Sequence, residues 1–308
     1  MEATYDEDDS RVYVTRDARQ QLYDASGYGE PVDGDAVSLS AVEAAYLLSQ
    51  GKLSEVDGEG YAAFLKRAVE DPAVLRVYSD LRDRGYYLDH DDELRLYERG
   101  AHPANASPRT RVSALDEKAR VEPAALPALL AVADDDGDVT YFSVERLEPE
   151  GDFPQPSDDV RIERRGGENV TRDAGILEEP RYGAPVEDGR VLSDTETAYL
   201  RDRGFVETPS DEAPRTEDDR LAVYADLRDR GTCPRTGFKF GSDFRVYETT
   251  DDDHAGLLVS AYDSDVSLSV VELSRAVRLA HGVRKRTVFA LVGEGAYVEY
   301  VAVERERP

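Results

Sequence analysis

The chain contains very little of the residues that form disulfides and most transition-metal sites. Its 308 residues include one cysteine, Cys233, four histidines, one methionine and no tryptophan. A single cysteine excludes a disulfide within the chain, and one cysteine with four histidines offers no zinc-type cluster. We therefore expect no structural metal and no cofactor.

Long hydrophobic runs are missing as well. Residues 1–9 are acidic and lack the apolar segment of a signal peptide. The longest nearly apolar stretch, 123–133, is too short to cross a bilayer. These absences predict a cytoplasmic protein with no membrane association.

Positive charge is scarce, and lysine above all. The chain has 66 acidic and 38 basic residues, a net charge of −28, and five lysines against 33 arginines. Because 40% of its residues are hydrophobic, it has enough apolar material for a folded core. Excess carboxylate keeps a protein soluble in concentrated salt, and the salt screens the repulsion between like charges. We interpret the acidity as adaptation to a high-salt cytosol, so local basic clusters must be weighed against it when nucleic-acid binding is considered.

What the chain does have is a long internal repeat. The segment VYSDLRDRG at 77–85 returns as VYADLRDRG at 223–231, and LSAVE at 39–43 is matched by LSDTE at 192–196. The copies lie about 150 residues apart, which is the length of a domain. The sequence predicts a mixed α/β fold made by tandem duplication, each half having a small N-terminal α/β subdomain followed by a mixed-sheet subdomain. The predicted boundaries are 1–71, 72–154, 155–216 and 217–308.

Local patterns place several elements within this frame. Capping boxes predict helix starts at three serines, each with a glutamate three residues later: Ser40, Ser193 and Ser269. Each nine-residue repeat reads as a helix that ends at its glycine. Strands are expected at 287–292 and 297–303, joined by a hairpin at 293–295, and Tyr247 is expected at a strand end. The stretch 148–173 has no sustained period, so we interpret it as a linker with an irregular continuation.

Three residues with potentially catalytic side chains gather in the last quarter of the chain: Tyr247, His254 and Lys285. Singly, each has an ordinary structural explanation. The surrounding blocks, VYADLRDRG at 223–231, TGFKFGSDFRVY at 236–247 and RLAHGVRKRTVFA at 278–290, together resemble the catalytic domain of archaeal tRNA-splicing endonucleases, in their two-repeat homodimeric form. The resemblance is strong over 218–308, and the duplication extends it over the whole chain.

The resemblance implies that Tyr247, His254 and Lys285 are the catalytic residues of a nuclease-like subdomain. It implies metal-independent cleavage of precursor tRNA at bulge–helix–bulge elements, giving 2′,3′-cyclic phosphate and 5′-OH ends. The residue types suit this chemistry, which needs a base for the 2′-OH, an acid for the leaving oxygen and a cation for the charged phosphorane. Free histidine titrates near pH 6.5, as an acid should, whereas free tyrosine is mostly protonated at neutral pH and is the less natural base.

The first half keeps Tyr97 and His102, but the position of Lys285 aligns near Ala125, so no cation is available there. We expect this half to be a degenerate, non-catalytic copy. A homodimer would then hold two active sites, and the resemblance implies that an acidic hairpin, Asp134, Asp135, Asp136 and Asp138, docks onto the other subunit.

The family also holds an unpaired RNA base between arginines. Arg278 is the candidate for one of them, while Tyr300 stands roughly where the second is expected. Lys239 is a further possible RNA contact, with a turn-closing role as its alternative. The alternative function for the whole chain is a non-catalytic structural subunit or RNA-binding homologue, and a metal-dependent nuclease is a third option.

Overall fold

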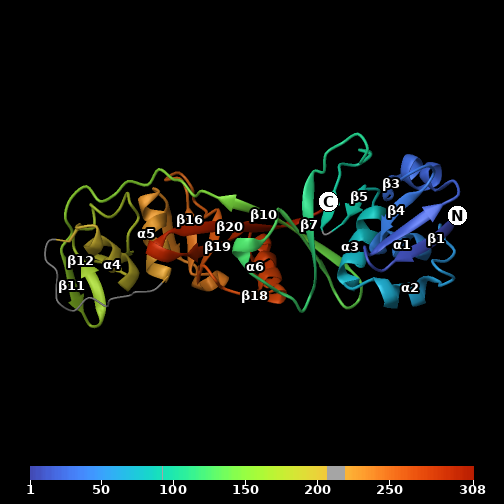
Figure 1. Cartoon of the computed structure of the whole chain (residues 1–308). Coiled ribbons are helices and arrows are strands. Elements are labelled where there is room, and N and C mark those ends of the chain that lie inside the picture. The colour runs from blue at the N-terminus through green and yellow to red at the C-terminus, as the bar shows by residue number, and fades with distance from the viewer. Residues whose placement is uncertain (92, 207–218) are drawn as a thin grey trace.

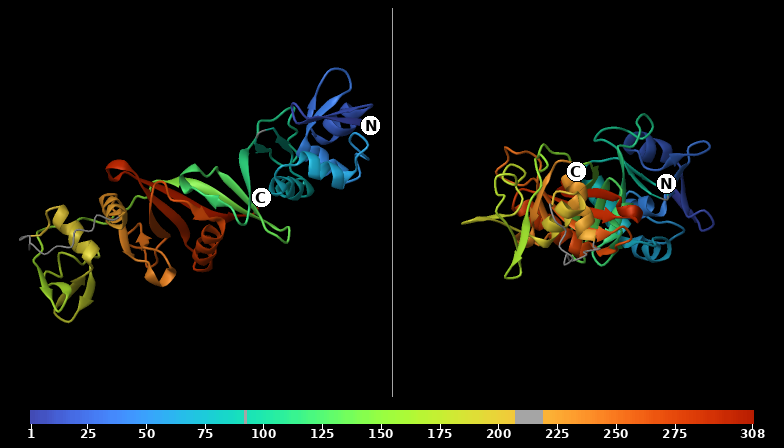
Figure 2. Two further views of the ribbon diagram at one scale, coloured as in Figure 1. Left: turned by 60° about the horizontal axis from the view of Figure 1, so that its bottom comes forward. Right: turned by 90° about the vertical axis from the view of Figure 1, so that its left-hand side faces the viewer.

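A computed structural model describes residues 1–91, 93–206 and 219–308. The molecule is elongated, with a long central sheet and a small α/β module at each end (Figure 1). The N-terminus lies in one end module, whereas the C-terminus lies near the middle, just beyond the end of β20, which pairs with β10. Turning the molecule shows the same arrangement, with the two modules at opposite ends of the sheet (Figure 2).

The first half opens with a four-stranded sheet of order β1-β2-β4-β3 and continues into one half of the central sheet. Its elements are β1 Glu2–Asp6, β2 Arg11–Thr15, η1 Arg19–Asp24, β3 Glu30–Pro31, β4 Val37–Ser40, α1 Ala41–Ser49, α2 Tyr61–Ala68, α3 Pro72–Asp83, β5 Leu88–His90, β6 Leu94–Leu96, β7 Thr110–Asp116, β8 Arg120–Val121, η2 Pro123–Ala125, β9 Leu129–Ala133 and β10 Val139–Leu147.

The second half repeats this order, with a four-stranded sheet β11-β12-β14-β13 at its start. Its elements are β11 Ile162–Arg165, β12 Glu168–Thr171, β13 Ala184–Val186, β14 Gly189–Leu192, α4 Asp194–Asp202, α5 Asp219–Asp229, β15 Cys233–Thr236, η3 Phe238–Phe240, β16 Phe244–Tyr247, β17 Leu257–Asp263, β18 Leu268–Ser269, α6 Val270–Gly282, β19 Arg286–Val292, η4 Glu294–Ala296 and β20 Val298–Glu306. The predicted mixed α/β class and duplicated layout are therefore confirmed.

The two halves meet where β10 pairs with β20 in the middle of a ten-stranded sheet, β15-β16-β17-β19-β20-β10-β9-β7-β6-β5. Val144 pairs with Val303 in this antiparallel contact. The sequence repeat aligns the segments VER at 144–146 and VER at 303–305, so equivalent residues of the two copies face each other. This pairing places an approximate two-fold axis between the halves.

Side chains that alternate along the central strands form separate cores on the two faces of the sheet. In β19, Val288 and Ala290 belong to the core that contains α5, whereas Phe289 and Leu291 belong to the core that contains α6. The α6 core also takes side chains from β9 and β10 of the first half. One helix of the second half therefore packs across the junction of both copies.

The nine-residue repeat holds each end module against the central sheet through an arginine, which is buried in the second half and half-buried in the first. Arg228 of α5 is 2% exposed and lies 3.8 Å from the ring centre of Tyr182. It donates to the Pro180 carbonyl (2.8 Å) and to the Tyr224 hydroxyl (3.0 Å). Arg82 of α3 makes the matching contact with Tyr28, at 3.9 Å. The repeated arginine thus joins the two parts of each half.

All three predicted capping boxes are present, at Ser40, Ser193 and Ser269. The interpretation of 148–173 as irregular is wrong, because β11 and β12 form an antiparallel hairpin there around Gly166 and Gly167. β11 is mostly exposed and has few apolar residues, so it carries no alternating pattern. The predicted boundary at 216/217 lies outside the described residues, and the four-part division remains a prediction.

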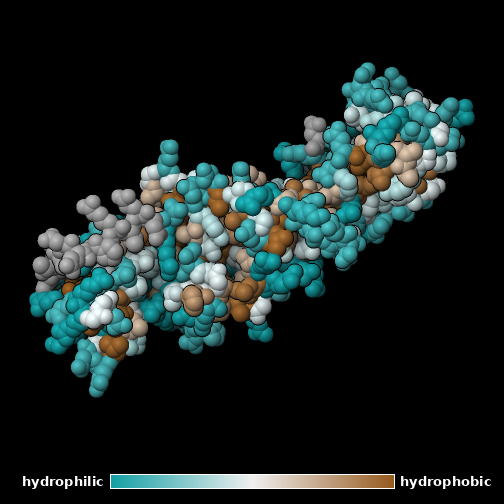
Figure 3. All heavy atoms as spheres, turned by 90° about the horizontal axis from the view of Figure 1, so that it is seen from below, coloured by the Kyte–Doolittle hydropathy of each residue, from teal (hydrophilic) through white to brown (hydrophobic). Residues whose placement is uncertain are grey.

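The surface is mostly hydrophilic, as expected for a chain in which 34% of the residues are charged. Hydrophilic side chains cover most of the face in Figure 3, with apolar residues in separate patches. Within the described residues, no helix is long and apolar enough to cross a membrane.

Candidate active site

Three neighbouring strands bring Tyr247, His254 and Lys285 to one edge of the central sheet. β16 ends at Tyr247, and β17 and β19 begin just after His254 and Lys285. The Gly256 N–H donates to the Val246 carbonyl (3.1 Å), and the Arg286 N–H donates to the Gly256 carbonyl (3.0 Å). β16 is antiparallel to β17, and β17 is parallel to β19, so the end of one strand and the starts of two meet at the same edge.

Lys285 is half-buried, and its ammonium group donates to the carbonyl of Ala255, the residue that follows His254. Partial burial, and then the nearby charges of Arg245 and Lys239, hold the pKa of Lys285 below its ordinary value. No carboxylate of the described chain lies within ion-pair distance of this lysine. Its charge is therefore available to an anion.

His254 is exposed at the end of the acidic loop 249–253. Two side chains from distant parts of the sequence hold this loop. Arg181 donates to the carbonyls of Asp252 (3.1 Å) and Thr250, and the Asp152 carboxylate accepts the Thr250 N–H (2.8 Å). Neither Arg181 nor Asp152 lies near the catalytic motifs in the chain, so the sequence carries no signal for these contacts.

Tyr247 is half-buried, and two guanidinium groups lie near its ring. Arg181 lies 5.7 Å and Arg245 lies 5.8 Å from the ring centre. Arg181 thus lies beside the tyrosine and, together with Asp152, holds the loop that ends at the histidine, so it helps to position both.

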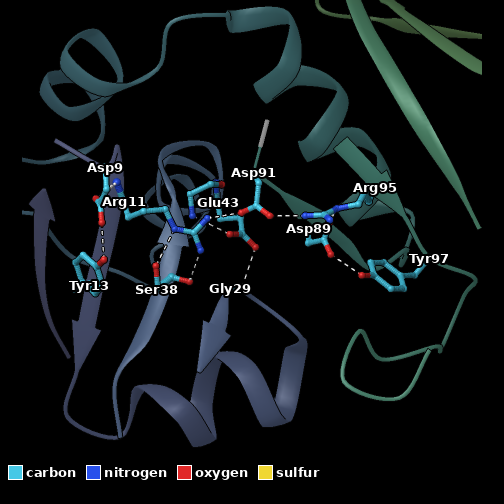
Figure 4. Close-up of polar contacts among 11 residues, drawn as sticks. Asp9, Arg11, Tyr13, Gly29, Ser38, Glu43, Asp89, Asp91, Arg95 and Tyr97 are labelled. Atoms are coloured by element: carbon cyan, nitrogen blue, oxygen red, sulfur yellow. Dashed lines mark hydrogen bonds and ion pairs between the residues drawn. The ribbon is translucent and has the colours of Figure 1, made fainter. Parts of the chain in front are cut away.

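The corresponding place in the first half is occupied by a structural network. The Tyr97 hydroxyl donates to Asp89, and Figure 4 shows Arg95 between Asp89 and Asp91, with Arg11 of β2 reaching Asp91. Burial, and then the hydrogen bond to Asp89, raise the pKa of Tyr97 above its ordinary value. This tyrosine is a donor to a carboxylate rather than a base.

The first-half residues that correspond to His254 and Lys285 are also unsuited to catalysis. The His102 ring lies between two tyrosines and forms a hydrogen bond through Nε2 with the Tyr23 carbonyl (2.7 Å). Strand register pairs Val259 with Val288 in the second half and Val112 with Leu129 in the first. Lys285 lies three residues before Val288, so its equivalent in the first half is Leu126, three residues before Leu129. An apolar residue thus stands where the second half has its cation, one position from Ala125.

Comparisons with known proteins match two segments of the chain to models of one family. Residues 218–300 match the family model "tRNA intron endonuclease, catalytic C-terminal domain", and residues 3–64 match "tRNA intron endonuclease, N-terminal domain". The tRNA-splicing endonuclease of Haloferax volcanii is 36% identical, over 98% of both chains. The chain belongs to the tRNA-splicing endonuclease family.

Other archaeal members of the family match over a similar extent. The tRNA-splicing endonuclease of Natronomonas pharaonis is 37% identical, over 97% of this chain and 98% of its own. That of Methanosarcina mazei is 33% identical, over 96% of both chains. The similarity therefore extends over nearly the whole length of this chain and of these relatives.

Two further predicted sites lie away from the strand ends in this family member. Arg278 is exposed on α6 and lines a small hollow together with His281 and Arg305. Tyr300 is 1% exposed, and its hydroxyl donates to Asp226 (2.7 Å). Its suggested role in stacking on RNA is therefore wrong, because its ring is inside the core.

The acidic residues 134–138 form the turn between β9 and β10. Asp135 pairs with Lys118 (2.8 Å), and both side chains are exposed. The carboxylates of Asp136 and Asp138 are exposed and have no partner among the described residues. No group of three or more metal-binding side chains occurs in the described part of the chain.

Proposed function

We propose that this chain cleaves precursor tRNA at bulge–helix–bulge intron junctions, without a metal ion, and leaves 2′,3′-cyclic phosphate and 5′-OH ends. The observation that carries the proposal is the meeting of Tyr247, the loop to His254, and Lys285 at three adjacent strand ends. This edge belongs to the half that matches the catalytic domain of the family. The shape of the RNA, rather than its base sequence, would then define the substrate.

Each residue has a role that its surroundings support. Tyr247 acts in its phenolate form, takes the proton of the 2′-OH and becomes a neutral phenol, and the resulting 2′-oxygen attacks the adjacent phosphorus. His254, exposed at the end of its loop, gives a proton to the departing 5′-oxygen. Lys285 lies beside both strand starts and stabilises the extra negative charge of the phosphorane. The bond to the 5′-oxygen breaks as the cyclic phosphate closes, so no water is consumed.

The RNA contact and the assembly are part of the same proposal. Arg278 contacts an unpaired base, and Arg305, in the same hollow, is a better second arginine than the buried Tyr300. The active form is a homodimer in which the hairpin 134–138 docks onto the second copy. Its support is the two unpaired carboxylates at the tip of that hairpin.

Cleavage of a synthetic bulge–helix–bulge RNA in potassium chloride and EDTA tests the chemistry. The wild type should give cyclic-phosphate ends, and His254→Ala and Lys285→Ala should each lower the single-turnover rate at least about 100-fold. Lys66→Ala, at an exposed lysine of the first half, is the matched control and should cleave normally.

Two results would contradict the proposal. Loss of wild-type cleavage in EDTA would favour the metal-dependent alternative. A folded, dimeric wild type that binds the RNA but does not cut it would favour the alternative of a structural or RNA-binding subunit.

A further inference from the structure

Phe238 is the most exposed of the large apolar side chains in the described chain, at 88%. It lies in η3, the turn between β15 and β16, within the segment GFKFG at 237–241. Single exposed apolar residues are common on proteins. This one is unusual in its position, because the same turn borders the candidate active site.

Hydrogen bonds fix the backbone of the turn, and this backbone conformation keeps the Phe238 side chain exposed. The Phe240 N–H donates to the Gly237 carbonyl (2.7 Å), and the Gly241 N–H donates to the Phe238 carbonyl (3.1 Å). Gly241 has a φ of +70°, and a Cβ on Gly237 would lie 2.3 Å from the Ser242 hydroxyl. The two glycines therefore allow a tight turn that presents the ring to solvent.

The turn is also surrounded by cations. The Lys239 ammonium lies 4.9 Å from the ring centre of Phe240, and the Lys285 ammonium lies 5.9 Å from the same ring. Arg245 and Lys239 are close enough to lower the pKa of Lys285. No carboxylate of the described chain pairs with Lys239, Arg245 or Lys285, although the sequence has 66 acidic residues.

We propose that Phe238 is a stacking platform for an unpaired RNA base that flanks the cleaved phosphate, and that Lys239 contacts the RNA backbone beside it. The inference rests on the proposed function, because it takes Lys285 to mark the scissile phosphate. An exposed aromatic ring beside cations is the usual combination for single-stranded RNA, since every base has a face that stacks. The turn that carries Phe238 lies beside Lys285 and Lys239, which no carboxylate of the described chain neutralises, so RNA, with its charged backbone, is the occupant that the position favours.

Three substitutions of Phe238 separate stacking from simple apolar contact. In a His254→Ala background, the equilibrium Kd for bulge–helix–bulge RNA is measured by fluorescence anisotropy at fixed potassium chloride. Phe238→Ala and Phe238→Leu should each weaken binding about 10-fold, while Phe238→Trp should stay within about two-fold of the parent. Tyr297→Ala is the matched control, because Tyr297 is 68% exposed on a different hairpin, and it should change nothing.

Lys239→Met provides a second measurement. Removing one phosphate contact should weaken binding and reduce the slope of log Kd against log salt by about one. A normal Kd for Phe238→Ala or for Phe238→Leu would overturn the proposal. So would an equal loss in the Tyr297 control, or a change in the sedimentation of Phe238→Ala that identifies the turn as a contact between proteins.

The outcome is independent of cleavage, because the background protein does not need to react. A wild type that binds RNA through Phe238 without cutting it would remove the proposed chemistry and keep the platform. A wild type that cuts RNA while Phe238→Ala binds normally would keep the proposed chemistry and overturn the stacking platform.

Discussion

Tyr97 and Tyr247 occupy equivalent strand positions in the two halves, but their hydroxyls have different surroundings. Tyr97 donates to Asp89 in a network that continues through Arg95 to the N-terminal sheet. Tyr247 lies near two guanidinium groups at the edge of the sheet. The same residue type is therefore structural in one copy and available for chemistry in the other.

Removing each hydroxyl should separate these roles. Tyr97→Phe should lower the free energy of unfolding by about 1 kcal/mol, because one hydrogen bond is lost, and leave RNA cleavage unchanged. Tyr247→Phe should change stability by less than about 0.5 kcal/mol and abolish cleavage. Denaturant unfolding and single-turnover cleavage check the pair, and a cleavage defect in Tyr97→Phe would refute the view of the first half as non-catalytic.

The lowered pKa of Lys285 makes a prediction about alkaline pH. The reaction needs the ammonium form of Lys285 as well as a proton on His254. Loss of the ammonium form should therefore appear as the more alkaline step in the fall of cleavage, at a lower pH than an ordinary lysine would give. Arg245→Gln removes a positive charge that opposes protonation, and the alkaline limb should move to higher pH.

Arg16→Gln, which removes an equal charge from the exposed Arg16–Glu2 pair of the first sheet, is the control for this measurement. The pH dependence of the single-turnover rate should be the same in this control as in the wild type. An unchanged limb in Arg245→Gln would argue that Lys285 is not the titrating group.

The sequence located the candidate catalytic residues but could not show what positions them. Motif order was enough to select Tyr247, His254 and Lys285. Arg181 lies about 70 residues before the loop that it holds, so its role appears only once the chain is folded. Burial of Tyr300 and exposure of Phe238 likewise depend on tertiary packing, which a single sequence does not reveal.

At the scale of elements, α6 is the main difference between the halves. The first half has only the short η2 between β8 and β9, whereas the second has a 13-residue helix between β18 and β19. Leu273 of α6 is fully buried in a core shared with β9 and β10. This helix therefore ties the two copies together as well as leading to Lys285.

Truncating the buried side of α6 should destabilise the whole molecule. Leu273→Ala should cost about 2–5 kcal/mol, since it leaves a cavity in that shared core. Val271→Ala, on the same helix at 40% exposure, should cost less than about 1 kcal/mol. Denaturant unfolding measures both, and equal costs would show that α6 does not join the halves as described.

The elements were predictable where local signals were strong. Capping boxes marked three helix starts, because their hydrogen bonds are formed by residues close in sequence. The hairpin of β11 and β12 was missed because its exposed strand has few apolar side chains. The pairing of β10 with β20 joins residues 159 positions apart, and no local pattern specifies it.

For the whole molecule, the net charge of −28 makes association depend on salt. Many ion pairs are exposed, such as Lys118–Asp135, and pairs of this kind add little stability. Concentrated salt screens the repulsion between two acidic copies, so it favours a dimer that dilute buffer would oppose. A contact between two chains that persists in concentrated salt must therefore come from groups that lie close together and are partly shielded from water.

The acidic hairpin is the place to test the proposed dimer. Asp136 and Asp138 are exposed and carry no partner among the described residues, so reversing their charge should disturb little within one chain. Asp136→Lys with Asp138→Lys should convert a dimer of 34.2 kDa chains to monomers in high potassium chloride, measured by sedimentation equilibrium. Asp158→Lys with Asp159→Lys reverses two exposed charges elsewhere and should leave the dimer intact. If the hairpin variant also remains a dimer at that salt concentration, the hairpin does not hold the chains together and another surface must be sought.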